Sequence, residues 1–381
     1  MRKAGVLAAV AAAFAAPAAA GVADASAQTV SAYGMGALKA EWQAGDGTWP
    51  DVNGIADLKL MGDANIGVYR ARFRRDRVLA GGTYSEWRQL DQLAREASLR
   101  GVALAPVLID MPGETYTPPK TSTARAAFAA FAQAAAQRYG PNGSFWLGCG
   151  CPKRPVKVWE VWNEPNIAPF WDIPDPVLYG YLLRDVRAAL RRVDPSARII
   201  FGGLAYPTSY SSTRYDPLSF LRQTIATVGR NGFDALAVHV YRADAASNVN
   251  TLIANTVATL RTYGGTQSGA PRHQLWLNEF GRPTALDNPS TATDERAKSE
   301  ATQAAWLDAM LNGLLPHRTD WNLGPVMWYS MRDASSPTAS WLRQGLRRTN
   351  PDDTDAGPKP AWNAYTNRSR TTAALALPVA R

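Results

Sequence analysis

The feature that most constrains the fold is the alternation of short apolar runs with longer amphipathic runs along most of the 381-residue sequence. Eight of the short runs have the length and composition of β-strands, and each is followed by a segment with helical periodicity. Strands that alternate with helices form parallel sheets, and eight such units in one uninterrupted domain predict a (β/α)8 (TIM) barrel. The predicted strands span residues 30–38, 66–73, 102–109, 156–162, 198–204, 235–241, 274–279 and 325–330.

The segments between these strands predict helices that cover the sheet with one apolar face. Ser122 or Thr123 is expected to cap the third helix, and Asp194, which precedes a proline, is expected to close the fourth. Asp294 and Glu295 are expected in the first turn of the seventh helix, where negative charge is favourable. The predicted helices span residues 51–63, 84–100, 122–139, 176–193, 217–230, 248–263, 294–315 and 358–367.

The sixth predicted strand favours a closed barrel over an open sheet. Its odd positions carry small or polar side chains, and its even positions carry aliphatic ones. In a barrel the aliphatic row packs outward against helices and the other row faces inward, whereas a strand of an open doubly wound sheet is usually apolar on both faces. The inward row is Ala235, Ala237, His239 and Tyr241, and the outward row is Leu236, Val238 and Val240.

No internal repeat or linker divides the chain, so we expect one barrel domain over residues 28–367 and a flexible tail over residues 368–381. Residues 1–27 have the pattern of a secretory signal peptide, because Arg2 and Lys3 precede an uncharged, alanine-rich stretch with small residues at two cleavage sites. We expect cleavage after Ala27, since the alternative, a membrane anchor, needs about 20 strongly apolar residues. The mature protein is then expected to be secreted, soluble and free of the membrane.

The remaining composition excludes several classes of function. The formal net charge is +9 but no long run of lysine and arginine occurs, so we expect no nucleic-acid partner. We also expect a monomer. The three histidines form no zinc motif, and neither a P-loop nor a complete dinucleotide fingerprint is present, so no metal and no cofactor is expected. Cys149 and Cys151 either pair with each other or remain free, which excludes a disulfide scaffold.

Two glutamates at predicted strand ends carry the strongest functional signal. The fourth strand runs directly into Asn163-Glu164-Pro165, and the seventh ends in Asn278-Glu279. Barrel enzymes place catalytic side chains at the carboxyl ends of their strands. Two carboxyls on either side of one bond suit glycoside cleavage, because one protonates the leaving oxygen while the other attacks the anomeric carbon. The structural alternative is that each glutamate caps a helix or pairs with an arginine.

The two roles require different pKa values. If Glu279 is the nucleophile it must stay ionised, and a hydrogen bond from Tyr241 or from an arginine would keep its pKa low. If Glu164 is the acid it must stay protonated, and an apolar setting beside the charge of Glu279 would raise its pKa.

On these motifs the chain resembles the retaining glycoside hydrolases of the large clan whose catalytic glutamates end strands four and seven, and it is most similar to families 5 and 39. The resemblance covers roughly residues 30–365 and implies that Glu164 is the general acid/base and Glu279 the nucleophile. The substrate-binding residues that it implies are Asn163 at the sugar 2-hydroxyl, Arg70 beside the nucleophile, His239 and Tyr241 of a His-x-Tyr motif, and Trp328 as the floor of the subsite where cleavage occurs.

Several positions have more than one interpretation. Arg72 has the same sidedness as Arg70 and is the alternative beside the nucleophile. Residues 358–362 resemble the Lys-Pro-Ala segment that opens the final helix in the clan, whereas Arg75 stands where many relatives carry a tryptophan. Further aromatic residues near strand ends either contact sugar or pack the loops; these are Phe170, Trp171, Tyr206 and Trp321.

The resemblance therefore implies a retaining glycosidase that hydrolyses β-linked O-glycosidic bonds of an oligo- or polysaccharide by double displacement, without a cofactor. The signal-peptide pattern adds the expectation that this enzyme is secreted. Two alternatives remain. One is a non-catalytic carbohydrate-binding barrel, and the other is transglycosylation in the same site with a sugar as acceptor. The sugar, the linkage and exo or endo action depend on long loops that the sequence pattern does not predict.

Overall fold

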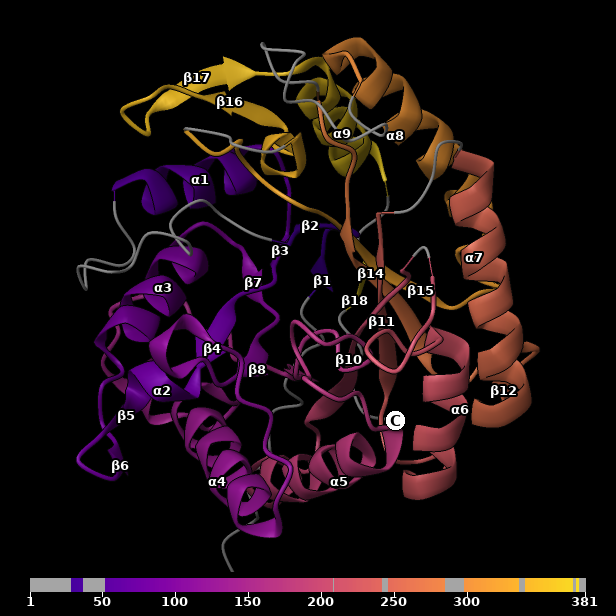
Figure 1. Cartoon of the computed structure of the whole chain (residues 1–381). Helices are drawn as coiled ribbons and strands as arrows, with labels where there is room; N and C mark the ends of the chain where they lie inside the picture. Colours follow the sequence, from indigo (N-terminus) through magenta and orange to yellow (C-terminus); the bar gives the residue numbers. More distant parts are fainter. Residues whose placement is uncertain are drawn as a thin grey trace, which may run out of the picture.

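The structure, a computed structural model, describes residues 29–36, 52–207, 209–241, 246–284, 298–335, 340–372 and 375–376. Its centre is a closed barrel of parallel strands surrounded by helices (Figure 1). The barrel begins with β2 (Tyr33–Met35), which pairs with β3 (Val68–Tyr69), and β3 pairs with β7 (Ala103–Leu104). The later strands are β9 (Val158–Val161), β10 (Arg198–Ala205), β11 (Ala235–Val240), β14 (Gln274–Phe280) and β15 (Leu323–Trp328). Each pairs with the next, and β15 pairs with β2 and closes the ring.

The second and third barrel strands are each interrupted. β3 is followed by β4 (Arg72–Arg74) and β7 by β8 (Val107–Ile109); β4 pairs with β8, which pairs with β9. The ladder continues across the interruptions, because the Ala105 N–H donates to the Tyr69 carbonyl at 2.9 Å. With each interrupted strand counted once, the described residues form eight barrel strands in sequence order. All eight predicted strands are present, the first over Tyr33–Met35, and residues 37–38 of that prediction lie outside the described residues.

The predicted helices are confirmed with shifts at their ends. The third is capped by Thr121, whose side chain accepts from the Ala124 N–H, and not by Ser122 or Thr123. Asp194 closes the fourth, as predicted. The helices are α1 (Val52–Asp63), α3 (Arg88–Leu99), α4 (Ser122–Tyr139), α5 (Pro176–Val193), α6 (Pro217–Val228), α7 (Ala246–Thr259), α8 (Glu300–Leu314) and α9 (Pro360–Thr371).

Shorter elements lie in the loops. α8 begins after Ser299, whose hydroxyl accepts from the Thr302 N–H, and Asp294 and Glu295, predicted for its first turn, lie outside the described residues. The short elements are α2 (Arg75–Val78), the π-helical turn Leu260–Gly264 and the hairpins β5 (Leu79–Ala80) with β6 (Thr83–Tyr84), β12 (Thr266–Gln267) with β13 (Ala270–Pro271), and β16 (Arg347–Thr349) with β17 (Asp355–Pro358).

Apolar side chains fill the barrel from both sides of its wall. The larger core lies between the strands and the helices and includes Leu236, Val238 and Val240 of β11, so the predicted sidedness of the sixth strand is confirmed. This arrangement leaves the inward row of each strand free to present polar groups where the strand ends. The interior cluster comprises Val68, Ala103, Ala105, Val158, Ile200, Ala235, Ala237, Trp276 and Met327.

The two ends of the described chain meet. β1 (Thr29–Val30) pairs antiparallel with β18 (Leu375–Ala376), and α9 continues to Thr371 with Ser369 fully buried against the Ala64 carbonyl. The predicted flexible tail 368–381 is therefore ordered in its first residues, because they belong to a packed helix. The rest of that tail, apart from β18, and the predicted signal peptide 1–27 lie outside the described residues.

Cys149 and Cys151 are joined in a disulfide within the loop that follows α4. Among the helices of the described segments, none has the combination of length and apolar character that crossing a membrane requires.

Candidate active site

The carboxyl-terminal ends of the barrel strands bring six of the predicted site residues into one polar group, the strand-end cluster. Five of them are less than 10% exposed, and Tyr241 is partly buried. They come from the ends of four barrel strands or from the first three residues after them. The cluster comprises Arg70 after β3, Asn163 and Glu164 after β9, His239 at the end of β11, Tyr241 after it and Glu279 in β14, together with Glu160, described below.

A left-handed backbone after β9 aims two of these side chains. Trp162 and Glu164 have φ angles of 70° and 43°, conformations that are uncommon outside glycine and cost roughly 1–3 kcal/mol each. Trp162 packs outward, with ring centroids 5.7 Å from Phe128 and 5.9 Å from Trp171. Asn163 and Glu164 consequently both face the end of the barrel instead of alternating with Trp162.

Register shifts in two other strands have a similar effect. Opposite Val238 and His239 of β11, strand β14 places Leu277 and Glu279, so Asn278 is an inserted residue. A bulge of this kind turns consecutive side chains toward one face, and both Asn278 and Glu279 reach the strand-end cluster. β10 shifts register at Gly202 and Gly203.

Gly203 is required for a steric reason. A Cβ atom at this position would lie 1.9 Å from His239 Nε2, so any other residue would displace the imidazole. The main chain of Gly203 also contributes directly, because its carbonyl accepts from the Glu164 N–H at 3.1 Å.

Glu279 is held by two donors. Arg70 Nη1 donates to Glu279 Oε1 and the Tyr241 hydroxyl donates to Oε2, both at 2.5 Å. Burial by itself raises the pKa of this carboxyl, but the positive charges of His239 and Arg70 outweigh it. With the hydrogen bond from Tyr241, the pKa of Glu279 is lowered below its usual value. Glu279 therefore stays ionised and has a fixed orientation.

Glu164 has the opposite character. Its Oε1 lies 2.7 Å from His239 Nδ1. Burial raises the pKa of Glu164, and the negative charge of Glu279 adds to the rise, which exceeds the lowering effect of His239. Glu164 therefore keeps its proton to a higher pH than an ordinary glutamate.

His239 lies between the two carboxyls. Its Nδ1 is 2.7 Å from Glu164 Oε1 and 3.5 Å from Glu279 Oε2. Burial acts to lower the pKa of His239, but the charge of Glu279 and the bond to Glu164 raise it above its usual value. Its Nε2 is buried and has no hydrogen-bond partner among the described residues. The imidazole therefore serves the two carboxyls through Nδ1.

Glu160 belongs to the same cluster but is not among the predicted site residues. Its side chain is 2% exposed and accepts from Arg70 Nε at 2.6 Å and Arg70 Nη2 at 2.9 Å. It also accepts from the Gly203 N–H at 2.9 Å and from Asn278 Nδ2 at 2.8 Å. Glu160 lies on the same row of β9 as the interior residue Val158, so the period-two pattern is the signal that places a charge inside the barrel.

Arg70 connects these groups. Besides Glu160 and Glu279, it binds Asn163, whose Oδ1 accepts from Arg70 Nη2 at 2.7 Å. This bond leaves the Nδ2 group of Asn163 as its remaining donor. Arg72 on β4 is partly buried, and its charge also lowers the pKa of Glu279. The structure thus places Arg70 in direct contact with Glu279, with Arg72 on the same row.

The structure does not bring Trp328 to the cluster. Trp328 is fully buried, donates its indole N–H to the Gln344 carbonyl at 2.7 Å, and packs against Trp306 of α8. It faces outward because the residue before it, Met327, belongs to the barrel interior. The next residue, Tyr329, lies edge-on to Tyr241 with ring centroids 6.0 Å apart, and is the strand-eight aromatic residue beside the cluster.

The other aromatic candidates differ in position. Phe170 is partly exposed and packs edge-on against Tyr116, with centroids 4.6 Å apart. Trp171 is fully buried, the Tyr206 hydroxyl is bonded within the protein, and Trp321 precedes β15, at the opposite end of that strand. Phe170 is therefore the candidate that remains for contact with a sugar, and it lies against Tyr116 near the end of β9.

Arg75 is an ion-pair residue. Its Nη1 donates to Asp110 Oδ2 at 2.7 Å. Burial raises the pKa of Asp110, and the Arg75 charge opposes that rise. The pair joins the start of α2 to the segment after β8.

Glu164, His239 and Glu279 are also the described residues that could together hold a metal ion, since one ligand atom from each lies within 4.8 Å of the others. Their present bonds oppose this use. Both oxygens of Glu279 accept from Arg70 and Tyr241, and the raised pKa of His239 favours a proton on the nitrogen that faces Glu164. A cation would have to displace that proton and approach the Arg70 charge, so the geometry favours proton sharing.

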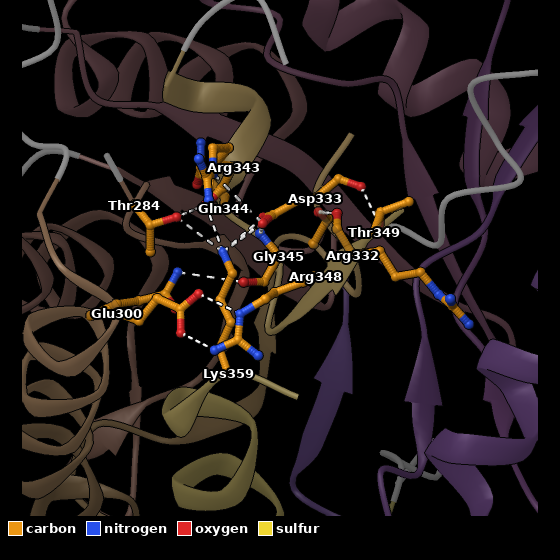
Figure 2. A network of polar contacts seen from close by, with 12 residues as sticks. Thr284, Glu300, Arg332, Asp333, Arg343, Gln344, Gly345, Arg348, Thr349 and Lys359 are labelled. Atoms are coloured by element: carbon orange, nitrogen blue, oxygen red, sulfur yellow. Dashed lines mark hydrogen bonds and ion pairs between the residues drawn. The ribbon is translucent and has the colours of Figure 1, made fainter. Parts of the chain in front are cut away.

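A second buried network lies in the segments that follow β14 and β15 (Figure 2). Lys359, fully buried, donates to Asp333 Oδ1 at 2.8 Å, Thr284 Oγ1 at 3.1 Å and the Arg343 carbonyl at 3.2 Å. Burial lowers the pKa of Lys359 and raises that of Asp333. We refer to these residues, with the neighbouring pair Glu300 and Arg348, as the Lys359 network. Lys359 directly precedes α9, so the segment 358–362 opens the final helix as predicted.

No protein-family model matches the chain, and no curated protein is significantly similar to it in sequence. Solved structures are similar in fold. A family 39 glycoside hydrolase from Bacteroides cellulosilyticus WH2 has a TM-score of 0.61 and 20% identity over 83% of this chain and 60% of its own. This chain therefore spans less than two thirds of that protein's length.

Two more structures have comparable similarity. A family 39 β-xylosidase from Caulobacter crescentus has a TM-score of 0.56 and 18% identity over 85% of this chain and 69% of its own. A family 51 α-L-arabinofuranosidase from Bifidobacterium longum has a TM-score of 0.60 and 11% identity over 91% of this chain and 74% of its own. At these identities the similarity establishes the fold alone.

Proposed function

We propose that this protein is a retaining glycoside hydrolase that cleaves β-glycosidic bonds by double displacement, with Glu279 as nucleophile and Glu164 as general acid/base. One observation carries the proposal: two buried carboxyl groups lie side by side, and their pKa values are shifted in opposite directions. The xylosidase and arabinofuranosidase of similar fold support a glycosidic substrate.

The spacing of the two glutamates supports the retaining mode. Retaining glycosidases have carboxyl groups about 5–5.5 Å apart, whereas inverting ones need about 6.5–9.5 Å to admit a water molecule. A carboxyl oxygen of Glu164 and one of Glu279 lie within 4.8 Å of each other. This near approach of two carboxyl oxygens supports direct attack by Glu279.

In the first step the Glu279 carboxylate attacks the anomeric carbon while the bond from that carbon to the leaving oxygen breaks. The proton of Glu164 moves to the leaving oxygen, so the aglycone departs as a neutral alcohol. Arg70 and Tyr241 hold the attacking carboxylate in place. The Nδ2 group of Asn163 is the donor available to a sugar hydroxyl.

In the second step water completes the reaction. Glu279 is now a glycosyl ester without charge, and since that charge contributed to the raised pKa of Glu164, the pKa of Glu164 falls. Glu164 can then take a proton from water, whose oxygen attacks the anomeric carbon and displaces Glu279. The sugar is released with its original anomeric configuration, and both glutamates return to their starting forms.

A mechanism-based label tests the proposal directly. Purified protein is incubated with activated 2-fluoro β-glycosides, beginning with the xyloside and glucoside, and its peptides are analysed by mass spectrometry. We expect one sugar to be attached to Glu279 and turnover of the matching aryl β-glycoside. Sugar binding without labelling or turnover would instead indicate a non-catalytic carbohydrate-binding barrel, and transfer products formed at high acceptor concentration would indicate a transglycosylase.

We also propose that the protein is secreted after removal of residues 1–27. The basic start, the alanine-rich stretch and the small residues before Gln28 support this proposal. Amino-terminal sequencing of the exported protein is expected to begin at Gln28. Recovery of the uncleaved chain in a membrane fraction would contradict it.

A further inference from the structure

We infer that Glu160 is a positioning residue that aims Arg70 at Glu279 and balances the charge of the strand-end cluster. The inference rests on the proposed function, because it concerns how the two reactive carboxyls are prepared. Glu160 lies beneath them on β9, with a side chain only 2% exposed, so a substrate does not reach it. Whatever Glu160 does for the reaction, it does through its neighbours.

The planar shape of the Arg70 guanidinium explains how Glu160 can aim it. Arg70 presents five N–H donors in one rigid plane. Glu160 accepts from Nε and Nη2, which occupy one edge of that plane. Fixing this edge directs Nη1 toward Glu279 Oε1, at 2.5 Å, and the second Nη2 hydrogen toward Asn163. Without Glu160, Arg70 would be free to rotate away from Glu279.

The second part follows from the charges. Glu160 accepts from four N–H donors, which leaves no place for a proton of its own, so it is a carboxylate. With Glu164 protonated for catalysis, the negative charges of Glu160 and Glu279 face the positive charge of Arg70, and the charge of Arg72 also acts on Glu279. Removing the charge of Glu160 would make the cluster more positive by one unit, which favours the ionised form of Glu164. The catalytic proton would then be lost at a lower pH.

A purely structural role makes a different prediction. Glu160 also joins β9 to β10 and β14 through the Gly203 N–H and Asn278 Nδ2. If only these links mattered, replacing Glu160 would lower stability and leave the titration of the other glutamates unchanged. The pH at which Glu164 loses its proton therefore separates the two roles.

The test uses three variants of the full chain. Glu160→Gln keeps the size and removes the charge, and Glu160→Asp keeps the charge but shortens the reach. Glu300→Gln is the matched control, because Glu300 also binds an arginine, Arg348, with both oxygens but lies in the Lys359 network. For each, kcat/KM against pH is measured with an aryl β-glycoside, and the carboxyl carbons of 13C-glutamate-labelled protein are titrated by NMR. The resonances of Glu164 and Glu279 are assigned from their Gln variants.

For Glu160→Gln we expect kcat/KM to fall by about ten- to a hundredfold, because Arg70 is misplaced. The alkaline limb of its kcat/KM profile should move to lower pH by about one unit. The titration midpoint of the Glu164 resonance should move in the same direction. For Glu160→Asp we expect a similar loss of kcat/KM, but the alkaline limb and the midpoint of the Glu164 titration should not move. Glu300→Gln should match the wild type in both measurements.

The outcomes are distinct. Unshifted Glu164 and Glu279 resonances in Glu160→Gln would overturn the inference whether or not the protein cleaves glycosides. If Glu160→Gln does not fold, wild-type kcat/KM in Glu160→Asp would overturn it. Absence of turnover by the wild type would refute the proposed function alone, since the NMR titration would still report on the charge balance.

Discussion

The two buried networks of this barrel use burial in different ways. In the Lys359 network, burial lowers the pKa of Lys359 and raises that of Asp333, so both partners are pushed toward their neutral forms and mutual attraction holds them charged. In the strand-end cluster, burial raises the pKa of both reactive carboxyls, yet Glu279 ends lower and Glu164 higher than usual. The cause of the difference is the distribution of donors.

Exposure separates the networks as well. The side chains of Lys359 and Asp333 are 0% and 6% exposed, whereas those of Glu164 and Glu279 are 10% and 12% exposed. The Lys359–Asp333 pair at the centre of the first network is sealed and satisfied, as suits a stabilising link between loops. The strand-end cluster instead has its two unequal carboxyls as slightly exposed members of an otherwise buried group. A buried ion pair alone is therefore no indication of catalysis. Two neighbouring carboxyls whose pKa values are shifted in opposite directions are such an indication.

The largest expected effect follows from removing either reactive carboxyl. Glu279→Gln and Glu164→Gln should each lower kcat on an unactivated β-glycoside by at least about 10³-fold, because nucleophile and proton donor are lost in turn. Circular dichroism and thermal unfolding should show an intact fold. Near-native rates in either folded variant would contradict the assigned roles.

Replacing the buried lysine should have the opposite profile. Lys359→Met leaves Asp333 buried without its cation, so we expect the free energy of unfolding to fall by about 3–5 kcal/mol, measured in urea. The shape of the pH–rate profile should stay that of the wild type at temperatures where the variant is folded. Lys359→Arg is the control that keeps the charge. A shifted pH profile in Lys359→Met would show that the two networks are not separate.

The acid limb of the pH–rate profile should depend on the hydrogen bonds that Glu279 accepts. The wild type is expected to be active above the lowered pKa of Glu279, where the nucleophile is ionised, and below the raised pKa of Glu164, where the acid is protonated. Tyr241→Phe removes a donor that lowers the pKa of Glu279, so the acid limb should move to higher pH and kcat/KM should fall by about tenfold. Tyr365→Phe, which removes a buried hydroxyl bonded to two carbonyls outside the cluster, should leave the acid limb in place.

The smallest effect is expected at the edge of the Lys359 network. Arg348 and Glu300 have side chains that are 42% and 23% exposed, and solvent screens such pairs. Glu300→Gln should change the free energy of unfolding by only about 0–1 kcal/mol. A loss as large as that of Lys359→Met would mean that this pair is part of the sealed link rather than its periphery.

Much of the fold could be predicted because its signals are local. Every barrel strand and most helix ends follow from runs of neighbouring residues, and Asn163-Glu164-Pro165 marks a strand end by its own composition. The pairing of Glu164 with Glu279 also followed, since the carboxyl ends of parallel strands meet at one end of a barrel.

The direction in which individual side chains point was harder to predict. Glu160 is not among the predicted site residues, although the period-two pattern of its strand places it on the inward row. Tyr329, and not the predicted Trp328, is the strand-eight aromatic residue at the cluster. Both Arg70 and Arg72 had the required sidedness, and contact with Glu279 distinguished Arg70.

The local sequence pattern specifies that eight strands alternate with helices and that two glutamates end the fourth and seventh. Which neighbours those glutamates have, and hence how their pKa values differ, depends on how the strands come together in three dimensions. The reason is that side-chain direction at a strand end depends on breaks in alternation, such as the left-handed Trp162 and the inserted Asn278. Such breaks arise from hydrogen bonds to strands distant in the chain, and these are absent from any local pattern.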